Sequence, residues 1–154
     1  MLSRTVSVFR RVVSGLLASD SPSQLAAGFT LGMVIGLVPK GNLIAVSLCV
    51  LLFSLRINKG LALAAAVLFS FVSPLADAFS HKLGLIVLGA NSLQATYASV
   101  FNFPLGPWLG LNNTVVTGSL LVGLYIAYPV YWAVRTLSAW LQSTATAPAS
   151  GGTS

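Results

Sequence analysis

The chain has few of the side chains that carry out enzymatic reactions. Its 154 residues include two acidic residues, one histidine and one cysteine. Hydrolytic and transfer enzymes need a nucleophile with a base, a pair of carboxylates or a bound metal. The sequence offers no carboxylate pair, no zinc-type ligand set and no Walker-type phosphate loop. We therefore predict a protein that is not an enzyme and that uses neither a cofactor nor a metal.

The chain also has few charged residues. Charged residues make up 6% of the chain and hydrophobic residues 56%, whereas an ordinary soluble domain is roughly 25% charged. A globule of this length could not bury so much apolar surface, so we expect the lipid bilayer to be its solvent. The net charge of +6 comes from single basic residues at the ends of apolar runs. Because these form no aromatic-studded basic patch, we predict no nucleic-acid partner.

Two apolar runs, residues 25–38 and 43–55, flank the sequence Pro39-Lys40-Gly41-Asn42. As helices, each run would reach only about 20 Å, against about 30 Å for the hydrocarbon core of a bilayer. The sequence therefore predicts a short hairpin that either crosses twice or re-enters on one side. Irregular backbone at membrane depth must be buried in protein or face water, which indicates a built site or interface at the turn.

The first twenty residues predict an amphipathic helix that lies on an anionic membrane surface. One face would carry Val6, Phe9, Val12, Val13, Leu16 and Leu17, and the other Arg4, Arg10, Arg11 and Ser14. A secretory signal does not fit, because the apolar stretch is short and interrupted. A mitochondrial transit peptide shares the arginine-rich, acid-poor character and stays open as an alternative.

A helix start follows, with Ser21 as N-cap, Pro22 in the first turn and Gln24 closing a capping box. This helix carries a stripe of glycines at four-residue spacing, which suits close backbone packing against another helix. The stripe consists of Gly28, Gly32 and Gly36. Similar stripes of small residues recur at Ala62, Ala66 and Ser70, and at Ser119, Gly123 and Ala127. The three stripes predict a tightly packed bundle.

The rest of the chain predicts a second hairpin and one full span. Residues 61–72 are apolar, meet Ser73-Pro74, and continue through polar positions to residue 88, a layout typical of a Pro-broken hairpin. Residues 91–113 look loop-like, and Asn112 or Asn113 would cap the final helix. Residues 114–134 would form a full-length transmembrane helix loosened at Pro129, with an aromatic belt at its end. We predict a single membrane domain over residues 21–142 and a disordered tail over residues 143–154.

The basic residues assign the sides of the membrane by the positive-inside rule. Six of them are placed in the cytoplasm, together with both termini: Arg4, Arg10, Arg11, Arg56, Lys59 and Arg135. Lys40 and Lys82 are then the exceptions, either buried or external. The prediction is a multi-pass protein, and it holds whether the first hairpin crosses or re-enters.

Charged residues inside membrane segments are candidates for function by default. The candidate polar site consists of Lys40, Asn42, Asp77, His81 and Lys82. In one interpretation Lys40 pairs with Asp77, and His81, one helical turn away, tunes the pair. In the other, Asp77, His81 and Lys82 only end a helix at a water interface.

Several segments resemble a family of small bacterial membrane proteins, the domain of unknown function numbered 2062, or a close relative of it. The resemblance rests on AAGFTLG at residues 26–32, GLVPKGN at 36–42, LRIN at 55–58, SPLAD at 73–77, KLG at 82–84 and NNTVVTGS at 112–119. Ser73 stands where asparagine is usual in that family. The resemblance implies an inner-membrane protein of bacteria with outer membranes, often encoded beside a larger uncharacterised protein.

Together these arguments predict an all-α integral membrane protein with an amphipathic N-terminal helix, Pro-broken short helical hairpins and one full-length C-terminal transmembrane helix. The expected function is that of a small non-enzymatic inner-membrane subunit or anchor that assembles with a larger cell-envelope partner, with the glycine stripe as its packing face. The alternative is a small transporter or channel built from paired re-entrant hairpins. Self-association into a homo-oligomer stays open.

Overall fold

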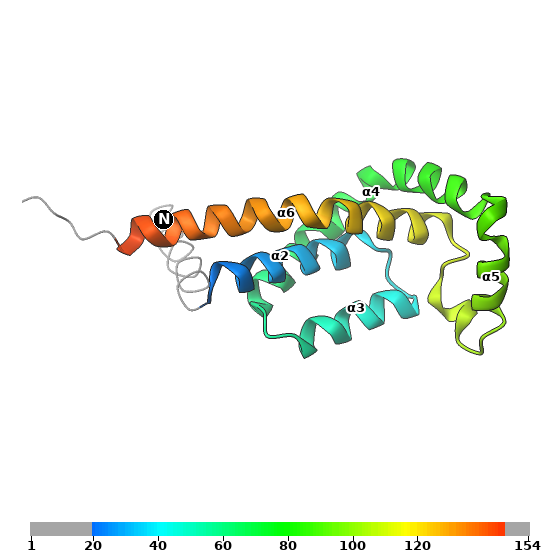
Figure 1. Cartoon of the computed structure of the whole chain (residues 1–154), viewed down its shortest axis with the longest axis horizontal. Helices are drawn as coiled ribbons and strands as arrows, with labels where there is room; N and C mark the ends of the chain where they lie inside the picture. Colours follow the sequence, from blue (N-terminus) through cyan, green and yellow to red (C-terminus); the bar gives the residue numbers. More distant parts are fainter. Residues whose placement is uncertain (1–19, 147–154) are drawn as a thin grey trace, which may run out of the picture.

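The computed structural model describes residues 20–146, and the secondary structure of this part of the chain is entirely helical (Figure 1). The predicted amphipathic helix of residues 1–20 lies outside the described residues except for Asp20. The elements are α2 (Pro22–Leu37), α3 (Leu43–Ser54), α4 (Lys59–Leu88), the 3-10 turn η1 (Asn91–Leu93), α5 (Gln94–Phe101), the 3-10 turn η2 (Gly106–Leu109) and α6 (Thr114–Thr146).

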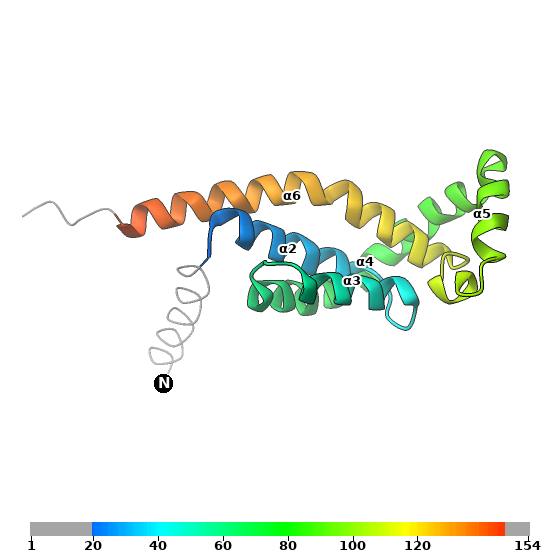
Figure 2. The same ribbon diagram turned by 60° about the horizontal axis from the view of Figure 1, so that its bottom comes forward.

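Three helices, α2, α4 and α6, pack side by side along the length of the molecule (Figures 1 and 2). α2 and α4 run in the same direction, because Gly28 lies against Asn58 and Gly36 lies against Ala66. α6 runs the opposite way, so that Gly123 in its middle meets Val34 of α2. The core between the helices includes Met33, Val34 and Leu37, with Leu120 and Ile126 of α6 packed on them.

The predicted first hairpin is confirmed, with α2 and α3 close to the expected bounds. The capping box is also confirmed: the Gln24 amide donates to Ser21 Oγ (3.3 Å), and the Ser21 amide donates to Gln24 Oε1 (3.0 Å). α3 folds back against the outer side of α2, where Leu52 packs with Ile35 and Ala62. Only Ala45 and Leu52 of α3 are buried, so this helix is peripheral.

The predicted second hairpin is wrong, because residues 59–88 form one continuous helix, α4, with Pro74 inside it. Proline removes one backbone donor and normally breaks a helix. Pro74 leaves the Ser70 carbonyl without its helical donor. Within α4, Ser70 Oγ donates to the Ala66 carbonyl (2.7 Å), and between helices Ser73 Oγ donates to the Leu37 carbonyl of α2 (3.0 Å). The Ser73 contact holds α4 to α2 immediately before the proline.

Residues 91–113 are not a plain loop, since they contain α5 and two 3-10 turns at one end of the molecule (Figure 1). α6 is longer than predicted and continues through Pro129 to Thr146. The first four residues of the predicted tail are therefore helical, and the others lie outside the described residues. Asn113 caps α6 as predicted, accepting from the Val115 amide (2.9 Å).

Two helices, α4 and α6, are long and apolar enough to cross a membrane. At about 1.5 Å per residue they reach roughly 45 and 50 Å. Much of their outer surface is apolar: Phe71 is 79% exposed, Leu75 85% and Tyr125 85%. Only four residues of α4 are buried: Ala62, Ala65, Ser80 and Gly84.

The close contact of α2 with α4 predicts that substitution of Gly32 by a larger residue destabilises the protein. A β-carbon there would overlap the backbone of Ala62, so Gly32→Ala must push the two helices apart. We expect a loss of about 2 kcal/mol or more in the free energy of unfolding, measured by thermal or denaturant unfolding in detergent. Ala64→Leu is the matched control on the exposed side of α4, expected within about 0.5 kcal/mol of wild type. Equal stability of the two variants would contradict the close contact.

Candidate functional site

The Lys40 side chain folds back onto the end of its own helix. Its Nζ donates to the carbonyl oxygens of Ile35 (2.9 Å), Gly36 (3.0 Å) and Val38 (3.0 Å). These carbonyls lie at the C-terminal end of α2, where backbone acceptors have no partner within the helix and the helix dipole is negative. Lys40 therefore acts as a charged cap that satisfies backbone groups which would otherwise be exposed.

Asn42 organises the turn and starts the next helix. Its Nδ2 donates to the Pro39 carbonyl (2.7 Å), and its Oδ1 accepts from the Ala45 amide (2.9 Å), so it is the N-cap of α3. Gly41 has a φ of +93°, a left-handed conformation that glycine adopts without strain. Lys40 and Asn42 thus close the two ends of the turn between α2 and α3.

Ser73 and Asp77 join this turn to α4. Ser73 Oγ donates to the Leu37 carbonyl at the end of α2 (3.0 Å) and lies 3.3 Å from Asp77 Oδ1. Leu37 is thereby the fourth residue near the end of α2 whose carbonyl is bound by a side chain. Ser73 therefore joins the end of α2 to α4.

His81 and Lys82 lie further along α4 and do not join this cluster. His81 Nδ1 is 2.6 Å from Thr114 Oγ1, so it links α4 to the first turn of α6. Lys82 is exposed. Asp77 and His81 each bind a different partner, Ser73 and Thr114, although they are one turn apart. Within residues 20–146 the predicted pairing of Lys40 with Asp77 is not formed, because each is bound elsewhere.

The candidate residues therefore do not form one site. Lys40 and Asn42 lie at the turn after α2 and Asp77 lies beside Ser73, whereas His81 lies at the crossing of α4 with α6 and Lys82 is exposed. Helix α4 also continues past Asp77, His81 and Lys82 to Leu88. Asp77, His81 and Lys82 therefore do not end a helix either. The candidate residues that form hydrogen bonds cap helix ends or join two helices.

The glycine stripe of α2 lies against α4 of the same chain. A β-carbon at Gly28 would come 2.5 Å from the Asn58 carbonyl oxygen, and one at Gly36 would come 2.6 Å from Phe69 Cβ. The predicted second stripe forms the other side of this contact through Ala62 and Ala66. The stripe is a helix-packing face, but because α4 covers it, it is not free to bind a partner protein.

Helices α4 and α6 cross closely, which was not predicted from the sequence. A β-carbon at Gly84 would overlap the backbone of Thr114, and one at Gly118 would overlap the backbone of Ser80. Each helix thus supplies small residues four apart, which lets the two backbones touch. The four-residue spacing of Ser80 and Gly84, and of Thr114 and Gly118, could have predicted this crossing.

A polar cluster at the opposite end of the bundle was also missed. Asn58 Nδ2 donates to Asp20 Oδ2 (2.8 Å), Gln142 Nε2 donates to the Asp20 carbonyl (3.0 Å), and the Asn58 amide donates to the Gln24 carbonyl (3.3 Å). Asn58 is 6% exposed and also caps α4. The cluster fastens the start of α2, the start of α4 and the end of α6 together. The one sequence feature that pointed to this cluster was the polar stretch at residues 56–60.

The cap formed by Lys40 predicts a specific loss of stability. Lys40→Met keeps the length of the side chain but leaves three carbonyl oxygens without their donor. We expect the free energy of unfolding to fall by about 1–2 kcal/mol, measured in detergent against wild type. Lys82→Met is the matched control, since that ammonium binds no described backbone group, and we expect almost no change. A similar effect of both substitutions would overturn the capping role.

Separate roles for Lys40 and Asp77 predict additive effects. In a double-mutant cycle of Lys40→Met and Asp77→Asn, independent sites should add to within about 0.5 kcal/mol. The measurement is the free energy of unfolding of the four proteins in one detergent. A larger interaction energy would mean that the two charges do pair, contrary to the contacts observed here.

Comparison with known proteins places the chain in a bacterial family. The family model described as "Uncharacterized protein conserved in bacteria (DUF2062)" matches residues 8–146. A similar protein, described as an uncharacterized protein of Treponema pallidum (strain Nichols), is 31% identical over 135 residues, which are 88% of this chain and 81% of that protein. No solved structure matches. The chain therefore belongs to the DUF2062 family of uncharacterised bacterial proteins, as its sequence motifs predict.

Proposed function

We propose that this chain is an inner-membrane protein that acts as a non-enzymatic subunit or anchor for a larger cell-envelope partner. The observation that carries the membrane part of this proposal is the apolar outer surface of α3, α4 and α6. Large side chains there are more than half exposed, including Val50, Phe53, Val67, Phe71, Leu75, Phe79 and Tyr128. Soluble proteins rarely expose apolar patches of this extent, whereas lipid is a suitable solvent for them.

The placement of charge supports the predicted sidedness. Arg56 and Lys59 lie beside the polar cluster that joins the starts of α2 and α4 to the end of α6. Arg135 lies seven residues before Gln142 on α6 and over the Trp132 ring, 5.0 Å from its centroid. Under the positive-inside rule this end is cytoplasmic. Lys82 is 23 residues from Lys59 along α4, or about 35 Å, which suits the opposite interface.

The hairpin of α2 and α3 fits a re-entrant segment better than two crossings. α2 runs parallel to α4 and ends opposite Ser73, about 20 Å along α4 from Lys59. His81 and Thr114 meet more than 30 Å from Lys59 by the same measure. Asn42 lies against Gly110, whereas Lys40 and Gly41 are exposed. The Lys40 ammonium and the Asn42 amide bind the irregular backbone of the turn, and membrane depth requires that such groups be bound.

The segment after α4 offers a surface for the partner. This segment, which includes α5, lies at one end of the molecule (Figure 2). Its aromatic and aliphatic side chains are strongly exposed: Phe103 is 63% exposed, Leu105 54% and Trp108 73%. Exposed tryptophan and phenylalanine are typical of protein-binding surfaces and also of membrane interfaces. In this topology the surface faces the envelope side of the inner membrane, where a larger partner would be reached.

Transport receives less support from the geometry. The residues expected to line a path are bound to different parts of the fold: Lys40 to the end of α2, Asn42 to the start of α3, and His81 to α6. A path lined by them would first have to break helix caps. A subunit role requires no change in these hydrogen bonds.

The partner role is tested by crosslinking and tandem purification of the tagged full chain from membranes of its own bacterium. We expect one larger envelope protein to copurify, and the double substitution Phe103→Ala and Trp108→Ala to reduce its recovery several-fold, because buried aromatic side chains dominate interface energies. Phe71→Ala is the control, being equally exposed on α4. If no envelope protein copurifies, or if both variants recover it equally, the proposal fails.

A further inference from the structure

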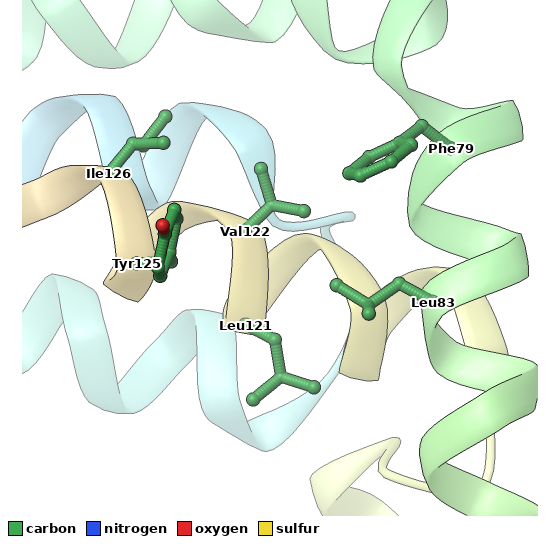
Figure 3. A pocket seen from close by; sticks show the side chains of 6 residues that line it. All are labelled: Phe79, Leu83, Leu121, Val122, Tyr125 and Ile126. Carbon is green, nitrogen blue, oxygen red and sulfur yellow. The ribbon is translucent and has the colours of Figure 1, made fainter.

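An apolar groove lies between the second half of α4 and the middle of α6 (Figure 3). Phe79 and Leu83 form the α4 wall, and the α6 wall is formed by Leu121, Val122, Tyr125 and Ile126. The groove has a volume of about 550 Å³, within the range of roughly 300–1,000 Å³ that is usual for small-molecule sites. Phe79 is 63% and Tyr125 85% exposed, so the groove opens outward.

One basic residue of α4, Lys82, adjoins the residues that line this groove. Lys82 precedes the groove residue Leu83 and follows Phe79 by three residues, which places it on the adjoining surface of α4. It is exposed. The two acidic residues of the chain lie elsewhere: Asn58 donates to Asp20 at the other end of the bundle, and Asp77 lies 3.3 Å from Ser73 Oγ. Within residues 20–146 Lys82 forms no ion pair, so its ammonium is available to an anion from outside the chain.

We propose that this groove binds one acyl chain of an anionic phospholipid whose phosphate pairs with Lys82. The inference rests on the proposed membrane location. An occupant must be apolar along the groove and negatively charged at its end, which is the chemistry of such a lipid. Lys82 lies about 35 Å from Lys59 along α4, so its ammonium reaches the headgroup layer of the outer leaflet while the groove runs toward the midplane.

The close crossing of α4 with α6 explains why a groove exists here. Gly84 and Gly118 bring the two backbones into contact, and the helices carry larger side chains on either side of that contact. Val122 and Ile126 lie one and two turns beyond Gly118. A lipid chain, being flexible, fills such an irregular surface without a complementary partner helix.

The test is quenching of a reporter tryptophan by brominated lipids. The full chain carries Tyr125→Trp in the groove, with Trp108, Trp132 and Trp140 changed to Phe, and is reconstituted into phosphatidylcholine vesicles. A minor fraction of brominated phosphatidylglycerol or brominated phosphatidylcholine is then added. We expect the apparent affinity at the groove to be roughly fivefold higher for the anionic lipid than for the zwitterionic one. This is the gain in affinity that one lysine near an anionic lipid surface contributes. Lys82→Gln should abolish the preference and Lys82→Arg should keep it.

Two controls separate failure of this inference from failure of the membrane proposal. Lys59→Gln, at the other end of α4, should leave the preference unchanged. A second reporter, Phe71→Trp on the outer surface of α4, should be quenched equally by both lipids. Equal quenching at the groove, or quenching at Phe71→Trp with none at the groove, overturns the lipid site, the latter indicating a protein occupant. Quenching at neither position means that the chain is not embedded in the bilayer.

Discussion

The fold depends on backbone-to-backbone contact between α2 and α4. Gly28, Gly32 and Gly36 bring α2 so close to α4 that a β-carbon at any of them would lie 2.6 Å or less from an atom of α4 or of its N-cap residue. In lipid, apolar helices gain little from hiding hydrophobic surface, so van der Waals packing of small residues supplies the attraction. A sixteen-residue helix would be a poor membrane segment by itself. Fixed along α4, it becomes part of a bundle, and α3 and α6 then pack on the pair.

In the proposed topology the short helix α2 ends at membrane depth, and side chains of the same chain bind the free backbone groups at that end. Lys40 binds three carbonyls at the end of α2, Ser73 binds the Leu37 carbonyl, and Asn42 caps α3. Unpaired backbone groups are unfavourable in hydrocarbon, because no water is present to bind them. The polar residues that would attract attention as a transport site therefore have a sufficient role in stabilising the turn.

Much of this architecture was predictable because it depends on local signals. The capping box at Ser21 and Gln24, the turn at Pro39 and the cap at Asn113 are all encoded within a few residues. The glycine stripe predicted a close helix contact but could not say with which helix. The second hairpin was predicted wrongly because Pro74 was taken as a break, whereas α4 continues through it and Ser73, one residue earlier, binds α2. The cluster of Asp20, Asn58 and Gln142 joins residues 122 positions apart, which no local pattern reveals.

The most direct test of this account uses the native Cys49, which lies on the outer side of α3 and is exposed in the structure. A membrane-impermeant maleimide is applied to intact spheroplasts and to inverted vesicles, with Asn102→Cys in a Cys49→Ser background as the water-exposed reference. If the hairpin lies in the bilayer against α4, Cys49 stays unlabelled from both sides and reacts only after solubilisation in denaturing detergent. Labelling of Cys49 from either side before solubilisation would show that α3 faces water, and would contradict the account.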